Sequence, residues 1–221
     1  MSGTHNGDGP AAVIFDLDGL LLDTESVWTR AEVKLFAQYG RTFGDAEKRR
    51  LIGTSGARAA GILEDMLGLP GEGAALSALV RDLVWTELEA GTEAQPGAVA
   101  LVAALARRGT PIGVASNSPR AIVDRSLSFS VFDAPFGVVL GGDEVEHPKP
   151  APDLYLEACR RLGADPARCV AFEDSPPGVA SARAAGLRVV GVPSFPGVTL
   201  EEAHVVTESL ADAAAREAVG L

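Results

Sequence analysis

The chain has 221 residues, of which 47% are hydrophobic, and it carries a formal net charge of −11. A chain of this length can bury a sizeable core, and its negative charge argues against nucleic acid or an acidic membrane as a partner. No apolar stretch reaches the roughly 18 residues of a membrane span, and the polar, glycine-rich start lacks the charged and apolar regions of a signal peptide.

The chain begins with a polar segment, residues 1–11, which we expect to be a disordered tail. The apolar run Val13 to Phe15 then predicts a short buried strand. Two aspartates, Asp16 and Asp18, follow at a spacing of two and are followed in turn by Gly19. An ordinary Asp-Gly turn after a strand would give the same pattern. In an open α/β sheet, however, both carboxylates would fall at the carboxyl edge, where such sheets bind their ligands.

From about Ser26 to Gly91 the pattern is helical almost throughout, with no strand visible. Apolar side chains recur on one face between Val27 and Tyr39, and Gly40 ends that helix. Further helices are predicted at Asp45–Ile52, Ala57–Leu67 and Ala74–Leu88. Linkers are predicted near Leu22–Glu25 and Gly91–Gln95. We therefore expect an all-helical cap, residues 25–91, inserted after the first strand.

From Pro96 onward helices and strands alternate. Strands are predicted at Ile112–Ser116, Gly137–Leu140, Cys169–Glu173, Leu187–Val192 and near His204–Val206. Helices are predicted at Ala98–Arg107, Pro119–Leu127, Pro152–Leu162 and Gly178–Ala185. Such alternation is typical of parallel βαβ units. The predicted fold class is therefore α/β, with a Rossmann-like parallel sheet core formed by residues 12–24 and 92–221.

Three of the later segments end in residues that carry chemistry. Ser116 and Asn117 close one strand, and Glu173 and Asp174 close another. Lys149 stands between two prolines, which hold the backbone extended just before a helix. Each feature has a structural alternative: a helix N-cap for the hydroxyl and amide, a solvated loop charge for the lysine, and a capping pair for the acids. Together with the aspartate pair after the first strand, they favour a single active site.

These four segments resemble the four motifs of the haloacid dehalogenase-like (HAD) superfamily, over nearly the whole chain from about Ala12 to Val206. Three longer stretches, Asp16 to Glu25, Gly142 to Asp153 and Phe172 to Ser175, look like the branch that holds β-phosphoglucomutase and small sugar-phosphate phosphatases. The resemblance agrees with a Rossmann-like core carrying a helical cap, and it implies chemistry through a phosphorylated aspartate.

Carried over position by position, the resemblance implies that Asp16 is the nucleophile and Asp18 the general acid and base. It also implies that Ser116, Asn117 and Lys149 bind the phosphate. A carboxylate that attacks a phosphate dianion meets like-charge repulsion. The charge of Lys149 and a divalent cation would both relieve that repulsion.

The same resemblance implies a magnesium site. Its ligands would be Asp16, Asp174 and the backbone carbonyl of Asp18, with Glu173 either a ligand itself or bonded to one. Hard oxygen ligands in a carboxylate-rich pocket favour Mg²⁺, which keeps several of its waters where a protein offers few ligands. Mg²⁺ is therefore the expected cofactor.

A cap beside the nucleophile can exclude water and contact the part of a substrate that is not phosphate. The cap residues suited to such contact are Trp28, Thr54, Ser55, Arg58 and Trp85. A tryptophan on an amphipathic helix can equally belong to the core, and Arg58 can equally be a solvated surface charge. Glycines on either side of Thr54 and Ser55 allow the backbone to approach a ligand closely.

The predicted function is Mg²⁺-dependent hydrolysis of a small sugar or polyol phosphate monoester through an aspartyl-phosphate. The main alternative is a phosphosugar mutase of the β-phosphoglucomutase type. In that family the first cap helix carries a histidine that gates the acid/base, and by spacing Trp28 takes its place here. An alternative of another class is a phospho-acceptor signalling domain, but such receivers have no helical insert and no second acid two residues after the acceptor.

The remaining features concern partners and location. A small phosphorylated metabolite is the expected partner, with no nucleic acid and no membrane, and the protein is expected to be a monomer. Cys159 and Cys169 show no metal-binding spacing, and buried thiols are favoured over a disulfide. A reducing, cytoplasmic location is therefore expected. The three histidines are scattered and give no zinc site.

Overall fold

The structure is a computed structural model of the whole chain, and it describes residues 9–54, 56–132 and 136–221. Most of the expected tail, residues 1–11, and the candidate substrate contact Ser55 lie outside the described residues. Within the described ranges, none of the helices combines the length and the apolar character needed to cross a membrane.

Six parallel strands form one sheet, in the order β3-β2-β1-β4-β5-β6. Their bounds are β1 Ala12–Phe15, β2 Ile112–Ala115, β3 Val138–Leu140, β4 Cys169–Glu173, β5 Arg188–Gly191 and β6 Val205–Val206. Strands that are covered on both faces read as continuous apolar runs, and β1, β2 and β4 are buried along their whole length. The predicted α/β class with a parallel sheet is confirmed, and each strand end lies within one residue of its predicted position.

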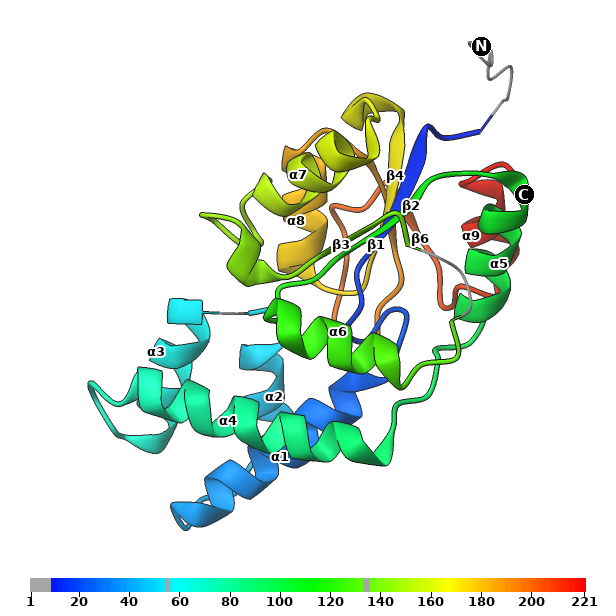
Figure 1. Cartoon of the computed structure of the whole chain (residues 1–221). Coiled ribbons are helices and arrows are strands. Elements are labelled where there is room, and N and C mark those ends of the chain that lie inside the picture. The colour runs from blue at the N-terminus through cyan, green and yellow to red at the C-terminus, as the bar shows by residue number, and fades with distance from the viewer. Residues whose placement is uncertain (1–8, 55, 133–135) are drawn as a thin grey trace.

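Helices cover both faces of the sheet (Figure 1). They are α5 (Ala98–Arg108) and α9 (Ala213–Glu217) on one face, and α7 (Asp153–Leu162) and α8 (Pro176–Ala184) on the other. Successive side chains of a strand point to opposite faces. Val13 and Phe15 accordingly join the hydrophobic cluster under α5, whereas Ala12 and Ile14 join the cluster under α7. This burial on both faces holds β1 in the centre of the sheet and fixes the place of the residues that follow it.

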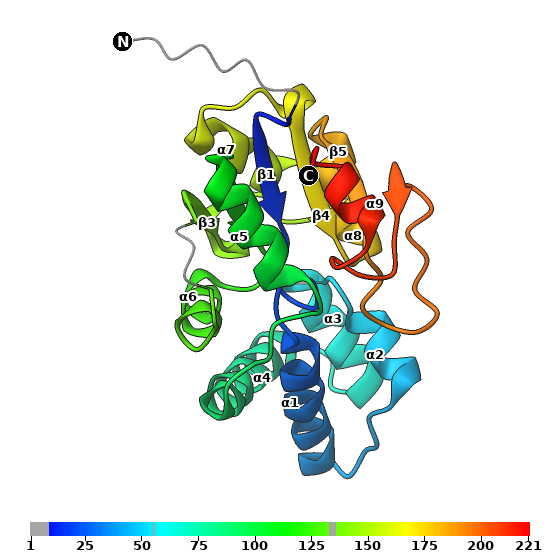
Figure 2. The same cartoon turned by 90° about the vertical axis from the view of Figure 1, so that its right-hand side faces the viewer.

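The segment between β1 and β2 is helical, as predicted. It contains α1 (Thr24–Gln38), α2 (Asp45–Leu51), α3 (Gly56–Leu67) and α4 (Gly73–Glu87), which we call the α1–α4 block. The block lies beyond the carboxyl ends of the strands (Figure 2). Its helices bury a hydrophobic cluster of their own, separate from the two clusters that cover the sheet.

The two chain segments that connect the block to the sheet run side by side. The N–H of Asp23 donates to the carbonyl of Glu93 at 2.8 Å, and the N–H of Gln95 donates to the carbonyl of Leu21 at 3.0 Å. A second contact comes from α6 (Arg120–Ser128), whose Ile122 packs into the hydrophobic cluster of the block. The paired connection and α6 therefore both tie the block to the rest of the chain.

Four short elements were not predicted from the sequence. They are the helix α9 and the 3₁₀ turns Leu88–Ala90, Gly142–Glu144 and Pro166–Arg168. Each is too short to show helical periodicity, since one helical turn already takes about 3.6 residues. Cys159 and Cys169 are free thiols and buried, as predicted.

Candidate active site

The carboxyl ends of three neighbouring strands bring the predicted polar residues to one edge of the sheet. β1 pairs with β2 on one side and with β4 on the other. Asp16, directly after β1, therefore lies between Ser116, directly after β2, and Asp174, directly after β4. A cavity of about 480 Å³ separates this edge from the α1–α4 block, and both sides contribute lining residues. Asp16 and Asp174 are among them.

Lys149 is buried between two carboxylates. Its Nζ lies 2.7 Å from Asp16 Oδ1 and 2.5 Å from Glu173 Oε1. Tyr155, on α7, donates its hydroxyl to the same oxygen of Glu173, a contact that the sequence did not predict. Burial acts to lower the pKa of Lys149, but the two carboxylates outweigh burial and raise it above its ordinary value. A fixed positive charge therefore stands beside Asp16.

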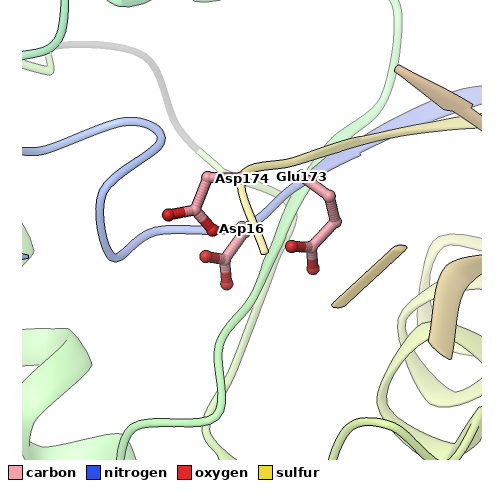
Figure 3. A group of neighbouring side chains, drawn as sticks. All are labelled: Asp16, Glu173 and Asp174. Atoms are coloured by element: carbon pink, nitrogen blue, oxygen red, sulfur yellow. The ribbon is translucent and has the colours of Figure 1, made fainter. Parts of the chain in front are cut away.

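Three buried carboxylates, those of Asp16, Glu173 and Asp174, each offer an oxygen within 4.8 Å of the others. Figure 3 shows Asp16 between the other two. Burial raises the pKa of Asp16 to about 8 despite the charge of Lys149. Burial, with the charges of Asp16 and Glu173, also raises the pKa of Asp174 well above its usual range. Acids crowded in this way favour a bound cation. Lys149 and Tyr155 both donate to Glu173, whereas Lys149 alone of these two donates to Asp16, so Asp16 and Asp174 are better placed as ligands.

Two glycines make room for these acids. A Cβ at Gly178, in the first turn of α8, would lie 1.9 Å from Glu173 Oε2. A Cβ at Gly19 would lie 2.4 Å from Asp174 Oδ2, and Gly19 also has a φ of +80°, which other residues rarely adopt. A larger residue at either position would clash with a site carboxylate, so both positions require glycine.

Asp18 is held by three hydroxyl groups. Thr24 Oγ1 donates to Asp18 Oδ1 at 2.7 Å. Ser116 Oγ and Ser118 Oγ donate to Asp18 Oδ2 at 2.7 and 2.8 Å. The carboxylate, which lines the cavity, thus has a defined orientation. Thr24 and Ser118 were missed in the sequence. Ser118 stands two residues after Ser116, but that spacing does not reveal which acid a hydroxyl meets.

Asn117, expected to bind phosphate, has its side chain bonded to the backbone. Its Nδ2 donates to the carbonyls of Lys149 and Gly53, both at 3.1 Å, and its Oδ1 accepts from the N–H of Lys149 at 2.8 Å. Both amide hydrogens are used in these bonds. In this arrangement the side chain positions Lys149 and bridges to the α1–α4 block, and a contact with phosphate would have to come from the Asn117 backbone.

The expected substrate contacts in the α1–α4 block divide into two groups. Trp28 and Thr54 line the cavity, although the Thr54 hydroxyl already donates to a backbone carbonyl. Arg58 and Trp85 are exposed and are not among the described residues that line it. The guanidinium of Arg125 instead lies 4.2 Å from the centroid of the Trp85 ring. Helical periodicity alone could not distinguish these two groups.

The wall formed by the α1–α4 block carries a buried ion cluster that was not predicted. Lys48 Nζ, on α2, lies 2.7 Å from Glu25 Oε2 and 3.1 Å from Glu32 Oε2, both on α1. All three line the cavity, and we call them the α1–α2 ion cluster. Burial raises the pKa of Glu32 to about 7, although Lys48 acts to lower it. In the sequence these residues resemble ordinary helix surface charges, and only the fold, which brings Lys48 to two acids of α1, places them in the cavity wall.

The raised pKa of Glu32 predicts a pH-dependent stability. Between pH 4.5 and about 7 the carboxyl group of Glu32 loses its proton in the unfolded chain but keeps it in the folded protein. The free energy of unfolding therefore falls as the pH rises, by on the order of 3 kcal/mol. Glu32→Gln should remove this contribution. Urea unfolding at about pH 5 and about pH 8 measures it, and equal losses of stability in the wild type and the variant would contradict the buried position of Glu32.

Comparison with known proteins gives consistent matches. A family model described as haloacid dehalogenase-like hydrolase matches residues 10–186. Protein CbbY of Rhodobacter capsulatus is 40% identical over 195 residues, which cover 83% of this chain and 85% of that protein. Hexitol phosphatase B of Escherichia coli (strain K12) is 30% identical over 187 residues, which cover 83% of each.

Solved structures agree with these matches. CbbY of Rhodobacter sphaeroides in complex with phosphate has a TM-score of 0.78 and 28% sequence identity, covering 92% of this chain and 96% of that one. Some relatives are longer than this chain. The chain spans about half the length, 52%, of the bifunctional riboflavin kinase/FMN phosphatase of Arabidopsis thaliana, to which it is 35% identical over 200 residues.

Proposed function

The chain belongs to the haloacid dehalogenase-like hydrolase family, and from this we propose that it is a Mg²⁺-dependent phosphatase that hydrolyses a small sugar or polyol phosphate through an aspartyl-phosphate. One arrangement at the end of β1 carries the proposal. Asp16 lines the cavity beside the charged Lys149, and Asp18, two residues further on, is held by three hydroxyls. The names of relatives, a hexitol phosphatase among them, support the substrate class.

Asp16 supplies the nucleophile. One of its carboxylate oxygens attacks phosphorus, the bond from phosphorus to the ester oxygen breaks, and the phosphoryl group is transferred to Asp16. Lys149, positioned by Asn117, offsets negative charge on the phosphoryl oxygens. A hydroxyl can rotate, so Ser116 can turn from Asp18 to donate to the same group.

Asp18 moves the protons. In the first step its protonated carboxyl gives a proton to the leaving alkoxide. In the second step the resulting carboxylate takes a proton from water, whose oxygen attacks phosphorus, and inorganic phosphate leaves as its bond to Asp16 breaks. Thr24 and Ser118 orient the carboxyl in both steps. One acid thus serves both halves of the reaction.

Mg²⁺ is the cation that this donor set fits. Asp16 and Asp174 would hold it, together with the backbone carbonyl of Asp18, and such hard oxygen ligands favour Mg²⁺. When bound, the ion offsets the repulsion between the attacking carboxylate and the phosphate. Glu173 acts on Lys149 instead, because its Oε1 accepts from Lys149 and Tyr155.

We assign the α1–α4 block, residues 25–91, the role of a cap over a core of residues 12–24 and 92–221. Residues from both parts line the cavity, so the block is placed to exclude water from the phosphoryl group. A volume of about 480 Å³ suits a small phosphorylated metabolite. We also propose a monomer and, because buried free thiols suit a reducing compartment, a cytoplasmic location.

Chelation and a panel of phosphate esters test the function. We expect EDTA to abolish phosphate release, Mg²⁺ to restore it and Ca²⁺ to inhibit it, because the larger shell of calcium relaxes the geometry of attack. Phosphate released from sugar, polyol and p-nitrophenyl phosphates is the measurement. Full hydrolysis in the chelator, with trace metal controlled, would rule out the metal.

β-Glucose 1-phosphate with a bisphosphate primer distinguishes a phosphatase from a mutase. We expect release of phosphate and little glucose 6-phosphate; mostly glucose 6-phosphate would indicate a mutase.

A further inference from the structure

We propose that the α1–α2 ion cluster of Glu25, Glu32 and Lys48 binds hydroxyl groups of the substrate and excludes a second anionic group. The substrate is then a monophosphate ester of an uncharged polyhydroxy compound. This inference rests on the proposed phosphatase function, and it adds the chemistry of the part of the substrate that is not phosphate.

The ion cluster shares the cavity of the nucleophile but belongs to its other wall. Asp16 lines the wall formed by the sheet edge, whereas Glu25 and Glu32 come from α1 and Lys48 from α2. Glu25 reaches close to the catalytic acids, since a Cβ at Gly19 would lie 2.4 Å from Asp174 Oδ2 and 3.0 Å from Glu25 Cγ. Because both walls line one cavity, the alcohol part of a phosphate ester attacked by Asp16 can contact this cluster.

The positive charge of Lys48 is already compensated. Lys48 and Glu32 are only 3% and 4% exposed, and a lysine is rarely buried at this depth unless it is paired. With Nζ 2.7 Å from Glu25 Oε2 and 3.1 Å from Glu32 Oε2, two carboxylates face one ammonium. At about pH 8, where Glu32 is mostly ionised, the formal charge of the cluster is −1. A second phosphate, or a carboxylate on the substrate, would meet this net negative charge at low solvent exposure.

Hydrogen-bonding capacity remains for a neutral ligand. Lys48 donates to Glu32 Oε2 and forms an ion pair with Glu25 Oε2. Ser77 Oγ is a buried polar atom without a hydrogen-bond partner among the described residues, and its side chain lines the cavity together with that of Glu25. Buried polar atoms left in this state are costly. Hydroxyl groups can donate to the carboxylate and also pair with the serine, whereas a phosphate dianion only accepts.

Arg81 is the residue that could oppose this selection. It also lines the cavity, but it is exposed, so solvent and salt screen its charge more than that of the buried cluster. If Arg81 were the recognition residue for the far end of the substrate, a second anion would be favoured rather than excluded. The two possibilities therefore predict opposite preferences.

Two matched pairs of esters test the proposal with the wild-type protein. They are glucitol 6-phosphate against glucitol 1,6-bisphosphate, and glycerol 3-phosphate against 3-phosphoglycerate. In each pair the second compound replaces a neutral end by an anionic one. At about pH 8, where Glu32 is mostly ionised, kcat/KM should favour the first compound by at least about tenfold, with most of the difference in KM.

Three variants assign the preference to the cluster. Glu32→Gln removes one negative charge at nearly constant size. In each pair the ratio of the two kcat/KM values should therefore fall toward one. Glu25→Gln should do the same and replaces Glu32→Gln if that variant does not fold. Asp82→Asn is the matched control, because it removes the same charge from an exposed position on α4. Its preference should equal that of the wild type.

The outcomes are distinct. A wild-type ratio near one, a preference for the bisphosphate, or an unchanged ratio in both glutamine variants overturns the proposal. Loss of bisphosphate turnover in Arg81→Gln would then assign the far end of the cavity to Arg81. Failure of the phosphatase function is recognised separately, since then no ester, p-nitrophenyl phosphate included, releases phosphate. Calorimetric binding of the same pairs would still decide whether the cluster selects neutral ligands.

Discussion

Asp16→Asn should reduce phosphate release to background, a loss of at least about 10⁴-fold, because an amide cannot attack phosphorus. The fold should survive the change. Asparagine keeps an oxygen that can accept from Lys149, and it removes a carboxylate whose pKa burial raises to about 8. Phosphate release from the preferred ester and thermal unfolding of the same preparation measure the two effects.

Asp143→Asn is the matched control for this change. Asp143 lines the same cavity, and its Oδ1 accepts from the N–H of Arg120 at 2.7 Å, a contact that asparagine can keep. Its activity should stay close to that of the wild type. If Asp16→Asn retained activity within about tenfold of the wild type, a barrier change of only about 1.4 kcal/mol, Asp16 could not be the nucleophile.

Asp18→Ala should slow the hydrolysis of alkyl phosphates by about 10² to 10⁴-fold, the usual contribution of a positioned acid or base. p-Nitrophenyl phosphate should lose less, since its leaving group needs little protonation. The measurement is kcat/KM for both ester classes. Asp18→Asn is a stricter test, because it keeps an acceptor for the surrounding hydroxyls but cannot carry the proton.

Ser118→Ala separates proton transfer from orientation. It removes one of the three hydroxyls that hold Asp18 and leaves the carboxyl itself in place. The loss of kcat/KM in Ser118→Ala should be much smaller than the loss in Asp18→Ala, and it should be similar for both ester classes. A loss in Asp18→Ala that is the same for alkyl and p-nitrophenyl phosphates would speak for a structural role of Asp18 and against the acid/base role.

The strand-end residues could be predicted from the sequence because two simple regularities fix them. Apolar runs locate the strands, and parallel strands bring their carboxyl ends to one edge. Asp16, Ser116 and Asp174 meet for this reason, whatever the helices do. The boundaries of the strands followed from the same runs, whereas the short α9 carried too few residues for a periodic pattern.

Residues that depend on the packing of helices could not be predicted in the same way. Lys48 and Arg58 both look like surface charges on amphipathic helices, yet Lys48 is buried in the cavity wall and Arg58 is exposed. Tyr155 reaches Glu173 only because α7 packs on the face of the sheet to which Cys169 and Ala171 of β4 also point. Asn117 was placed correctly after β2, but its bonds to the backbone of Lys149 depend on how two loops meet.

The central position of β1 has a consequence for the synthesis of the chain. β1 is made first, yet its partners are made much later: Val13 lies beside Ile112 of β2, and Ala12 beside Cys169 of β4. The whole α1–α4 block leaves the ribosome in between, while the apolar β1 is still unpaired. An unpaired apolar strand invites aggregation during that interval. A nascent chain that stalls before β4 thus has the nucleophile but lacks Glu173 and Asp174, and so has no catalytic centre.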